Sequence, residues 1–582
     1  MVARSLHDKV INQSENGYLG RLARAIVAWG QESIVGPTRL VLLAGVWVAA
    51  WVAGRFVGSF VDVGGHPGIL SKYGLVVLAA FGSLSLLAWA RSMAIRLGFR
   101  ASNPVGEGTK SSIGPMELLV LLAVAFAGAL AALSSGLGGM AASAVLVGLL
   151  GASVVIYRPE VLLLVMAAFP WVDYGARVLL AGNGLGAAWD EVFLLVSIVA
   201  LFIAIFVTRR SEALVPRLLA PIVLVAVAAI GSVVVMGVPD ETATFALRVL
   251  LQPMLFFFLA LLLPCDDRWF KALIGVFIAS SLLLALHGLY QYVTGAPMPA
   301  RWVDASETGI HTRAYSIIGN PNGLGTLLLL GASLAVGLAV TPLRSWVRVG
   351  AAAASVVMTA CLAVTFSRGS WLGFIFGLTC FALLAHRRLL IAMAAGAVAL
   401  PFILPSVLID RLAFAFSPEY LAKSLTFGRL YIWETAMYRI ADHPWFGLGL
   451  GTFGSTSANR FGYSPLWIDQ YYLQLGAEGG IALLLAFLWL LFRLAKGVVA
   501  SYLVQEDGLR RAFVSGVFGG MCAVAFANLT ASYWETLTVG VGFWFLAGIA
   551  TRLGLERGVP PPPERGVRVE VLTAREPNRL SE

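Results

Sequence analysis

Five arginines near two polar stretches of an otherwise apolar chain are the residues best suited to chemistry. Arg301 and Arg313 lie in the stretch 292–319, Arg368 begins an apolar run, and Arg429 and Arg439 lie in the stretch 409–473. A guanidinium presents a planar fork of donors that matches a phosphate group and keeps its charge beside a membrane. If the five converge on one face, they predict a binding site for an anion.

Each arginine also has a simpler explanation. Arg429 can pair with Glu434, and Arg439 can pair with Asp442. An exposed ion pair of this kind contributes little, and a long basic side chain can also extend to the membrane surface. Both explanations stay open at this point.

Aromatic side chains are denser in the stretch 409–473 than the 11% of the whole chain. Such rings can stack on sugars. Trp and Tyr also gather at the headgroup level of any membrane protein. Composition does not decide between these two roles for Phe414, Phe416, Tyr420, Phe427, Tyr431, Trp433, Tyr438, Trp445, Phe446, Phe453, Phe461, Tyr463, Trp467, Tyr471 and Tyr472.

The composition of the chain indicates that transmembrane helices position the candidate residues. Of the 582 residues, 59% are hydrophobic and 12% are charged, against about 25% charged in ordinary soluble domains. Apolar runs long enough to cross a bilayer as a helix recur along the chain, which excludes a soluble enzyme, a disordered chain and a β-barrel. The sequence predicts an all-α membrane protein of about 14–16 transmembrane helices, near 40–58, 73–90, 115–133, 138–156, 159–170, 190–207, 216–236, 244–263, 271–291, 320–340, 347–366, 370–386, 388–408, 474–492, 512–532 and 536–552.

The distribution of basic residues predicts the orientation. Most of the 41 Lys and Arg residues fall in connections on the side of both termini, and the positive-inside rule makes that side cytoplasmic. The net charge of +10 thus points to membrane topology rather than to nucleic acid. Predicted domains are a cytoplasmic segment 1–38, additional helices in 39–157, a transmembrane core 158–553 with a large external loop at 409–473, and a disordered cytoplasmic tail 554–582.

Four motifs in the order expected of one family carry a resemblance. They are Arg313 followed by GNPNGL at 319–324, TFSRGSWLG at 365–373, GRLYIW at 428–433 followed by DHPWFGLGLGTF at 442–453, and YLQLGAEGG at 472–480. In order, spacing and topology these motifs resemble the O-antigen ligase and O-antigen polymerase family of membrane glycosyltransferases.

The resemblance implies an enzyme of the bacterial cytoplasmic membrane whose active site faces outward. Its donor would be a polyprenyl diphosphate-linked oligosaccharide, and its acceptor a glycan, a lipid or a protein hydroxyl. Neither a cofactor nor a metal is expected. The reaction would build a cell-surface polysaccharide, as a ligase or as a polymerase.

The same resemblance assigns roles to residues. Arg313 and Arg429 match the arginines that the family places on the diphosphate, and Arg368 is a third candidate. Fixed cations there would stabilise the charge that develops on the leaving diphosphate. Weaker substrate-binding candidates are Arg301, Arg439, Asn322, Trp433, Tyr472, His311 and Glu434. The segment Asn320–Asn322 is expected to begin a helix.

The family's general base is a histidine in many ligases, but this chain has Asp469 just before Tyr471–Leu473. An acid at this position is similar to some polymerase-type members, and Asp469 is the predicted base that takes the proton of the acceptor hydroxyl. His311 is a weaker alternative because it lies close to Arg313.

Two other classes compete with the transferase. A transporter or flippase for a lipid-linked glycan or a small anion would need polar groups at the middle of the membrane, but the predicted helices hold few besides Arg248, His287 and Asn528. A non-catalytic relative would explain the missing histidine. The collection of polar residues on one face favours the transferase.

Overall fold

Helices form all of the regular secondary structure that is described. The computed structural model describes residues 159–179, 189, 193, 216–263, 265–299, 302–303, 310–403, 406–414, 417–426, 428–464 and 467–556. Its elements there are α-helices and short 3-10 helices, so the all-α prediction is confirmed. The predictions for residues 1–157, for the helix near 190–207, for Arg301 and for the tail beyond 556 fall outside these ranges.

Eight described helices are long and apolar enough to cross a membrane, or nine if one bent pair forms a single span. This confirms a polytopic membrane protein, while the cytoplasmic position of both termini stays a prediction. The eight are α13 (Asp240–Leu262), α14 (Asp267–Thr294), α15 (Pro321–Val340), α16 (Ser345–Val364), α17 (Arg368–Ala385), α23 (Tyr471–Val504), α24 (Gly508–Ala527) and α25 (Leu537–Glu556).

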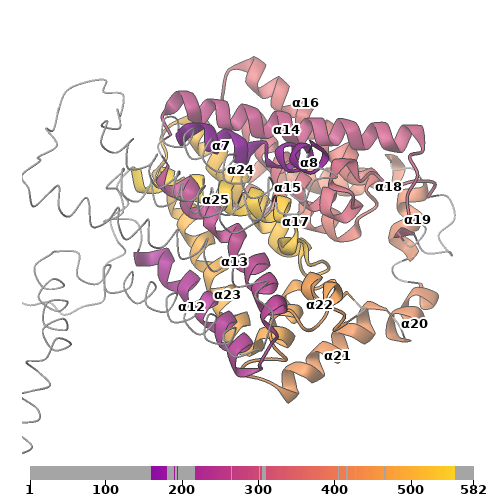
Figure 1. Cartoon of the computed structure of the whole chain (residues 1–582). Coiled ribbons are helices and arrows are strands. Elements are labelled where there is room, and N and C mark those ends of the chain that lie inside the picture. Colours follow the sequence, from indigo (N-terminus) through magenta and orange to yellow (C-terminus); the bar gives the residue numbers. More distant parts are fainter. Residues whose placement is uncertain are drawn as a thin grey trace, which may run out of the picture.

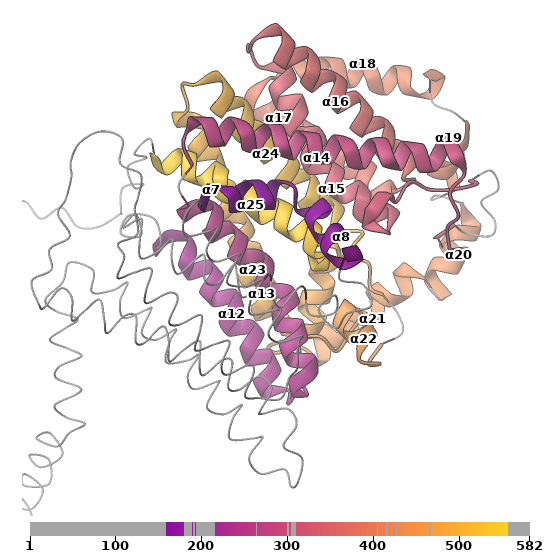
Figure 2. The same cartoon turned by 45° about the horizontal axis from the view of Figure 1, so that its top comes forward.

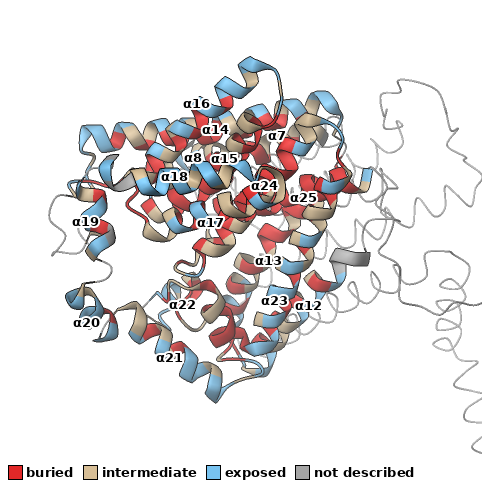
Figure 3. Ribbon diagram, turned by 180° about the vertical axis from the view of Figure 1, so that it is seen from behind, coloured by how far each residue is buried: buried red, intermediate tan, exposed pale blue. Residues whose placement is uncertain are grey.

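Two of these helices form the centre of the bundle. The apolar stretches of α25 and α15 are 94% and 83% buried, against 33% for α16 and 28% for α17. Figure 3 shows the buried centre around α15, α24 and α25 and the exposed outer faces of α16 and α18 (Arg388–Ile403). In Figure 1, α14 and α16 lie along one side of this centre, and α12 (Pro216–Val235), α13 and α23 lie on another.

Glycines let the central helices approach closely. A Cβ at Gly516 of α24 would lie 2.8 Å from Leu334 Cα of α15, and one at Gly377 of α17 would collide with the carbonyl oxygen of Gly519. Small residues allow such approach, which gives van der Waals contact where lipid offers no hydrophobic driving force. The bundle therefore provides a rigid support for the segments at its end.

Several predicted bounds were wrong in instructive ways. The helix predicted near 159–170 is two helices, α7 (Pro159–Ala167) and α8 (Phe169–Leu179), bent by 82°. The helix predicted to end near 408 ends at Ile403, and α25 continues through Gly554 to Glu556, into the predicted tail. The helix predicted at 474–492 begins at Tyr471 and is kinked at Gly480, where φ is +74°. Apolar runs alone do not show where a helix bends.

The predicted large loop at 409–473 is largely helical. It contains most of α19 (Ser406–Phe414), α20 (Pro418–Thr426), α21 (Arg429–Asp442) and α22 (Thr456–Arg460). In Figures 1 and 2 these helices lead from the end of α18 along one edge of the bundle to the start of α23. The starts of α15, α17, α21 and α23 thereby supply the polar residues described next.

Candidate functional site

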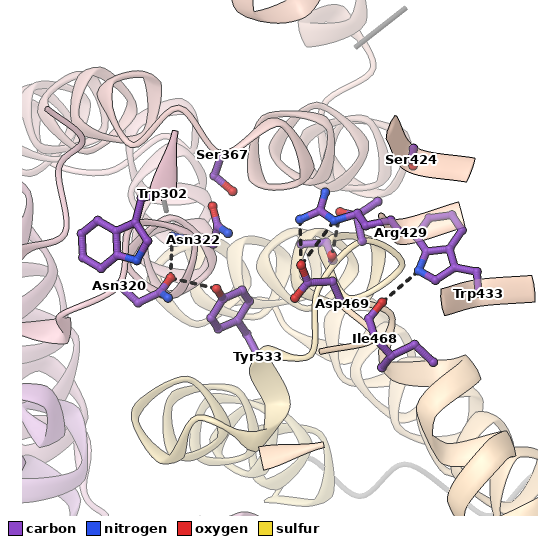
Figure 4. A network of polar contacts seen from close by, with 12 residues as sticks. Trp302, Asn320, Asn322, Ser367, Ser424, Arg429, Trp433, Ile468, Asp469 and Tyr533 are labelled. Atoms are coloured by element: carbon purple, nitrogen blue, oxygen red, sulfur yellow. Dashed lines mark hydrogen bonds and ion pairs between the residues drawn. The ribbon is translucent and has the colours of Figure 1, made fainter. Parts of the chain in front are cut away.

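An ion pair between the start of α21 and the start of α23 lies at the centre of the candidate site. Arg429 donates to Asp469 Oδ2 through Nη2 at 2.9 Å and through Nε at 3.3 Å. The two side chains are 35% and 37% exposed, so both remain accessible from one side. Figure 4 shows the pair with Asn322 and Tyr533 nearby. Arg429 therefore pairs with Asp469, and not with Glu434, the alternative partner that the sequence left open.

The backbone around Asp469 is held from two directions. Trp433 of α21 donates Nε1 to the carbonyl oxygen of Ile468 at 2.9 Å, and Gln470 caps α23 by accepting from Leu473 N at 2.6 Å. Asp469 itself has φ of +48°, a left-handed conformation that Asp tolerates better than most residues. Trp433 thus supports the carboxylate through the backbone.

Arg313 reaches the site from the segment before α15 and is nearly fully buried. It donates Nε to Thr365 O at 2.7 Å, Nη1 to Trp302 O at 2.8 Å and Nη2 to Asn322 Oδ1 at 2.7 Å. All three acceptors are neutral, so no carboxylate among the described residues compensates its charge. The charge of Arg313 is therefore available to an anion.

The pKa shifts show that the arginines are neighbours. Burial, together with the nearby charges of Arg429 and Arg368, lowers the pKa of Arg313 to about 10. Burial also opposes the charge of Arg429, but Asp469 outweighs this and raises the pKa of Arg429 above its usual value. Both guanidinium groups therefore stay protonated at neutral pH.

Arg368 joins the same cluster from the first residue of α17. Its guanidinium carbon lies 4.8 Å from the ring centroid of Tyr420 in α20, within the range of a cation–π contact. Its Nη1 donates to Arg411 O at 3.4 Å, and Arg411 Nε donates to Phe366 O at 3.4 Å. Sequence reasoning missed Arg411 and did not single out Tyr420, because their partners lie in other helices.

All three described non-glycine residues with positive φ flank these arginines. They are Ser316 at 48°, Phe366 at 52° and Asp469 at 48°. Ser316 follows Arg313 in sequence, and the carbonyl of Phe366 accepts from Arg411. Such conformations cost about 1–3 kcal/mol each and cluster at functional sites.

Two buried carboxylates attach the glycine-rich turn to the helices behind the site. Glu478 of α23 accepts from Phe453 N at 2.9 Å. Glu535, between α24 and α25, accepts from Thr456 N at 2.9 Å and from Thr456 Oγ1 at 2.7 Å. Both line one small pocket, and burial raises the pKa of Glu535. These acids hold the segment that follows α21 rather than facing Arg429.

Gly447, Gly449 and Gly451 in this turn have φ values of 64°, 105° and 86°. Glycine adopts such positive φ values without steric cost, so these three residues permit a tight turn here. Upstream, Asn320 caps α15 by accepting from Asn322 N at 2.9 Å and Gly323 N at 3.1 Å, with Pro321 in the first turn. The helix start expected at Asn320–Asn322 is confirmed.

Several candidates lie apart from the ion pair. Arg439 is exposed ten residues after Arg429 on α21, about 15 Å along the helix axis. Glu434 and His311 are exposed, and Glu434 accepts from Tyr438 on its own helix at 3.4 Å. Tyr472 donates its hydroxyl to Ala525 O at 2.8 Å, so that hydroxyl already has a partner in the bundle.

Sequence reasoning missed Tyr533, which lies between the two halves of the site in Figure 4. Its hydroxyl donates to Asn320 Oδ1 at 2.8 Å, and its charge environment includes Asp469, Arg313 and Arg429. The sequence held one sign that Tyr533 could belong to the site. Tyr533 lies in the short break between the helices predicted at 512–532 and 536–552, and this break falls on the same predicted side of the membrane as the stretch 409–473.

Comparison with known proteins agrees with the motifs. Residues 353–488 match the family model described as O-antigen ligase. The match contains Arg368, Arg429 and Asp469, whereas Arg313 and Tyr533 lie outside it. No curated protein matches the chain. Over the matched segment this polytopic all-α membrane protein is similar to O-antigen ligases, in agreement with the resemblance of its motifs.

Proposed function

We propose that this chain transfers or polymerises glycan from a polyprenyl diphosphate-linked donor onto an acceptor hydroxyl at the outer face of the cytoplasmic membrane. The relationship to O-antigen ligases supports a ligase-like or polymerase-like activity in general. The donor, the acceptor side of the membrane and the absence of a metal requirement are parts of the proposal.

One observation carries it: three neighbouring guanidinium groups have one contacting carboxylate among them. Arg313, Arg368 and Arg429 influence one another electrostatically, and Asp469 contacts only Arg429 among them. A diphosphate supplies the missing negative charge and the oxygen acceptors that a guanidinium fork binds. The three groups would provide the positive charge that a metal ion provides in other phosphate sites.

The reaction balances with these groups alone. The acceptor hydroxyl oxygen attacks the anomeric carbon of the donor, the bond from that carbon to the diphosphate oxygen breaks, and the diphosphate leaves with the electron pair. The guanidinium groups of Arg313, Arg429 and Arg368 stabilise the charge that develops there. Asp469 takes the hydroxyl proton and later passes it to water.

The ion pair gives the reaction an order. Arg429 occupies Oδ2 of Asp469, whereas Oδ1 accepts no hydrogen bond from any described residue. A donor diphosphate competes with Asp469 for the same guanidinium. Donor binding therefore weakens the hold of Arg429 on the carboxylate and makes Asp469 a better proton acceptor when the acceptor arrives.

The test uses the purified full chain in lipid nanodiscs with a polyprenyl diphosphate-linked oligosaccharide. Released diphosphate lipid and the size of the glycan product are both recorded for wild type, Arg429→Ala and Asp469→Asn. Arg460→Ala is the matched control, because Arg460 is another arginine of the same stretch and stacks on Phe245 and Phe461. Wild type and the control should give product.

The product identifies the activity. A ladder of lengthening glycan indicates a polymerase, and a single transfer to a second acceptor indicates a ligase. If wild type leaves the lipid-linked glycan covalently unchanged, the proposal is wrong and flux measurements on a transporter should replace it.

A further inference from the structure

Tyr533 lies in the short 3-10 helix η4 (Tyr533–Glu535), between α24 and α25, far in sequence from every motif of the site. Its hydroxyl donates to Asn320 Oδ1 at 2.8 Å, the same oxygen that accepts from Asn322 N at 2.9 Å and from Gly323 N at 3.1 Å. Its ring packs on Gly323, where a Cβ would lie 3.3 Å from Tyr533 Cε1. The Tyr533 side chain therefore contacts the start of α15 at its capping residue, Asn320, and at Gly323.

Asn322 connects this phenol to Arg313. Its Oδ1 accepts from Arg313 Nη2 at 2.7 Å, and its backbone N donates to the Asn320 oxygen that Tyr533 also contacts. Tyr533 thus holds the Asn320 cap, from which the first turn of α15 and its Asn322 are positioned. This arrangement holds the backbone of Asn322 in place, and its side chain presents the acceptor to Arg313.

The turn that carries Tyr533 also holds the opposite half of the site. Asn528, fully buried at the end of α24, accepts from Tyr533 N at 2.8 Å through Oδ1. Its backbone carbonyl and that of Ala531 each accept from Tyr471 N at 3.0 Å. Tyr471 begins α23 two residues after Asp469, so one turn sets the positions of Asp469 and of the Asn322–Arg313 contact.

We infer that Tyr533 is a positioning residue that holds Arg313, through Asn322, at a fixed place relative to Asp469. The inference rests on the proposed transfer, in which Arg313 receives charge from the leaving diphosphate while Asp469 takes the proton. Both events occur in one transition state, so the spacing of the two side chains matters more for turnover than for binding.

Burial and the charge of Asp469 raise the pKa of the Tyr533 hydroxyl. The phenol thus stays protonated at neutral pH and keeps donating to Asn320. It has no need to exchange protons during the reaction, which separates its role from that of Asp469.

The test compares Tyr533→Phe, Asn322→Ala and the double variant in the transfer assay. Tyr533→Phe removes one oxygen and keeps the ring on Gly323, so the fold should persist. Tyr502→Phe is the control, because Tyr502 is a buried tyrosine of α23 whose ring contacts Arg511. Thermal unfolding of each variant checks that stability is comparable.

We expect Tyr533→Phe to lower kcat by about tenfold to a hundredfold with a smaller change in donor KM. The double variant should be no slower than Asn322→Ala, because both changes break the same connection to Arg313. Additive losses, or a wild-type kcat for Tyr533→Phe, would overturn the inference while leaving the proposed transfer intact.

A second measurement separates the two proposals. Binding of a polyprenyl diphosphate without glycan is recorded for wild type and Tyr533→Phe in nanodiscs. If wild type binds this lipid but transfers no glycan, the proposed reaction fails. In that case, weaker binding of the lipid to Tyr533→Phe than to wild type supports the positioning of Arg313, and equal binding to both proteins overturns it. Absence of binding to wild type also overturns it.

Discussion

Arg429 directs two donors, Nε and Nη2, at one oxygen of Asp469, at 3.3 and 2.9 Å. A guanidinium facing a carboxylate more often engages both of its oxygens in parallel. The arrangement leaves Oδ1 of Asp469 without a hydrogen bond from Arg429. Asp469 is thus held by Arg429 through one oxygen only. This suits a general base that is released from Arg429 when the donor diphosphate binds that arginine.

Asp469→Asn should separate donor binding from transfer. The amide cannot take the acceptor proton, so we expect transfer to fall by at least about a hundredfold. The same change frees Arg429 from its counterion, so a polyprenyl diphosphate should bind as well as, or better than, it binds wild type. Lipid binding and product formation are measured on the same nanodisc samples. Loss of lipid binding in this variant would contradict the competition for Arg429.

Arg313→Lys should create a pH dependence that wild type lacks. Burial lowers the pKa of Arg313 to about 10, so its charge persists below about pH 9. The same burial acts on a lysine whose usual pKa is only about 10.4, and lowers it toward neutrality.

A lowered pKa means that the lysine is charged at low pH and loses its charge as pH rises. Donor-lipid binding by Arg313→Lys should therefore fall between about pH 6 and pH 9, while binding by wild type stays level. The shape of the profile is the decisive measurement, since the variant also loses hydrogen bonds. Parallel profiles for the two proteins would argue against the role of the Arg313 charge.

Gly447→Ala should destabilise the protein more than Gly462→Ala. Both glycines have positive φ, 64° and 76°, so each substitution costs about 1–2 kcal/mol of backbone strain. A Cβ at Gly447 would also lie 2.5 Å from the carbonyl carbon of Glu478, whereas one at Gly462 meets nothing within 4 Å. The crowding adds about 1–3 kcal/mol. Thermal unfolding of both variants in one detergent measures the difference, and equal losses would show that the turn can shift away from α23.

Glu535→Gln should reduce the pH dependence of stability. Burial raises the pKa of Glu535 above 4.5, so its protonated form is favoured in the folded state. The corresponding stabilisation is complete below the unfolded pKa and is lost as pH rises through the higher folded pKa. Wild type should unfold at lower temperature as pH rises above about 4.5, and the variant should show a shallower slope.

The control for this comparison is Glu419→Gln, since Glu419 is an exposed acid of α20 paired with Lys423. It should follow the wild-type slope. A slope for Glu535→Gln that matches wild type would place the pH dependence on other groups.

The sequence by itself determined the fold class and part of the site. Runs of apolar residues predict membrane helices because a bilayer selects length and hydropathy locally. Arg313, Arg429 and Asp469 could be singled out because they lie in short motifs, and Asn320 with Pro321 predicted a helix start from local capping chemistry.

The tertiary structure alone decided which of these residues meet. Asp469 pairs with Arg429 across 40 residues, whereas the nearby acid that the sequence offered as an alternative partner, Glu434, is exposed on the same helix as Arg429. Tyr533 reaches Asn320 across 213 residues. Neither contact has a sequence period, because each depends on how α15, α21, α23 and the turn after α24 pack together. Local residue patterns encode helices, but the meeting of helix ends is set by the packing of the whole bundle.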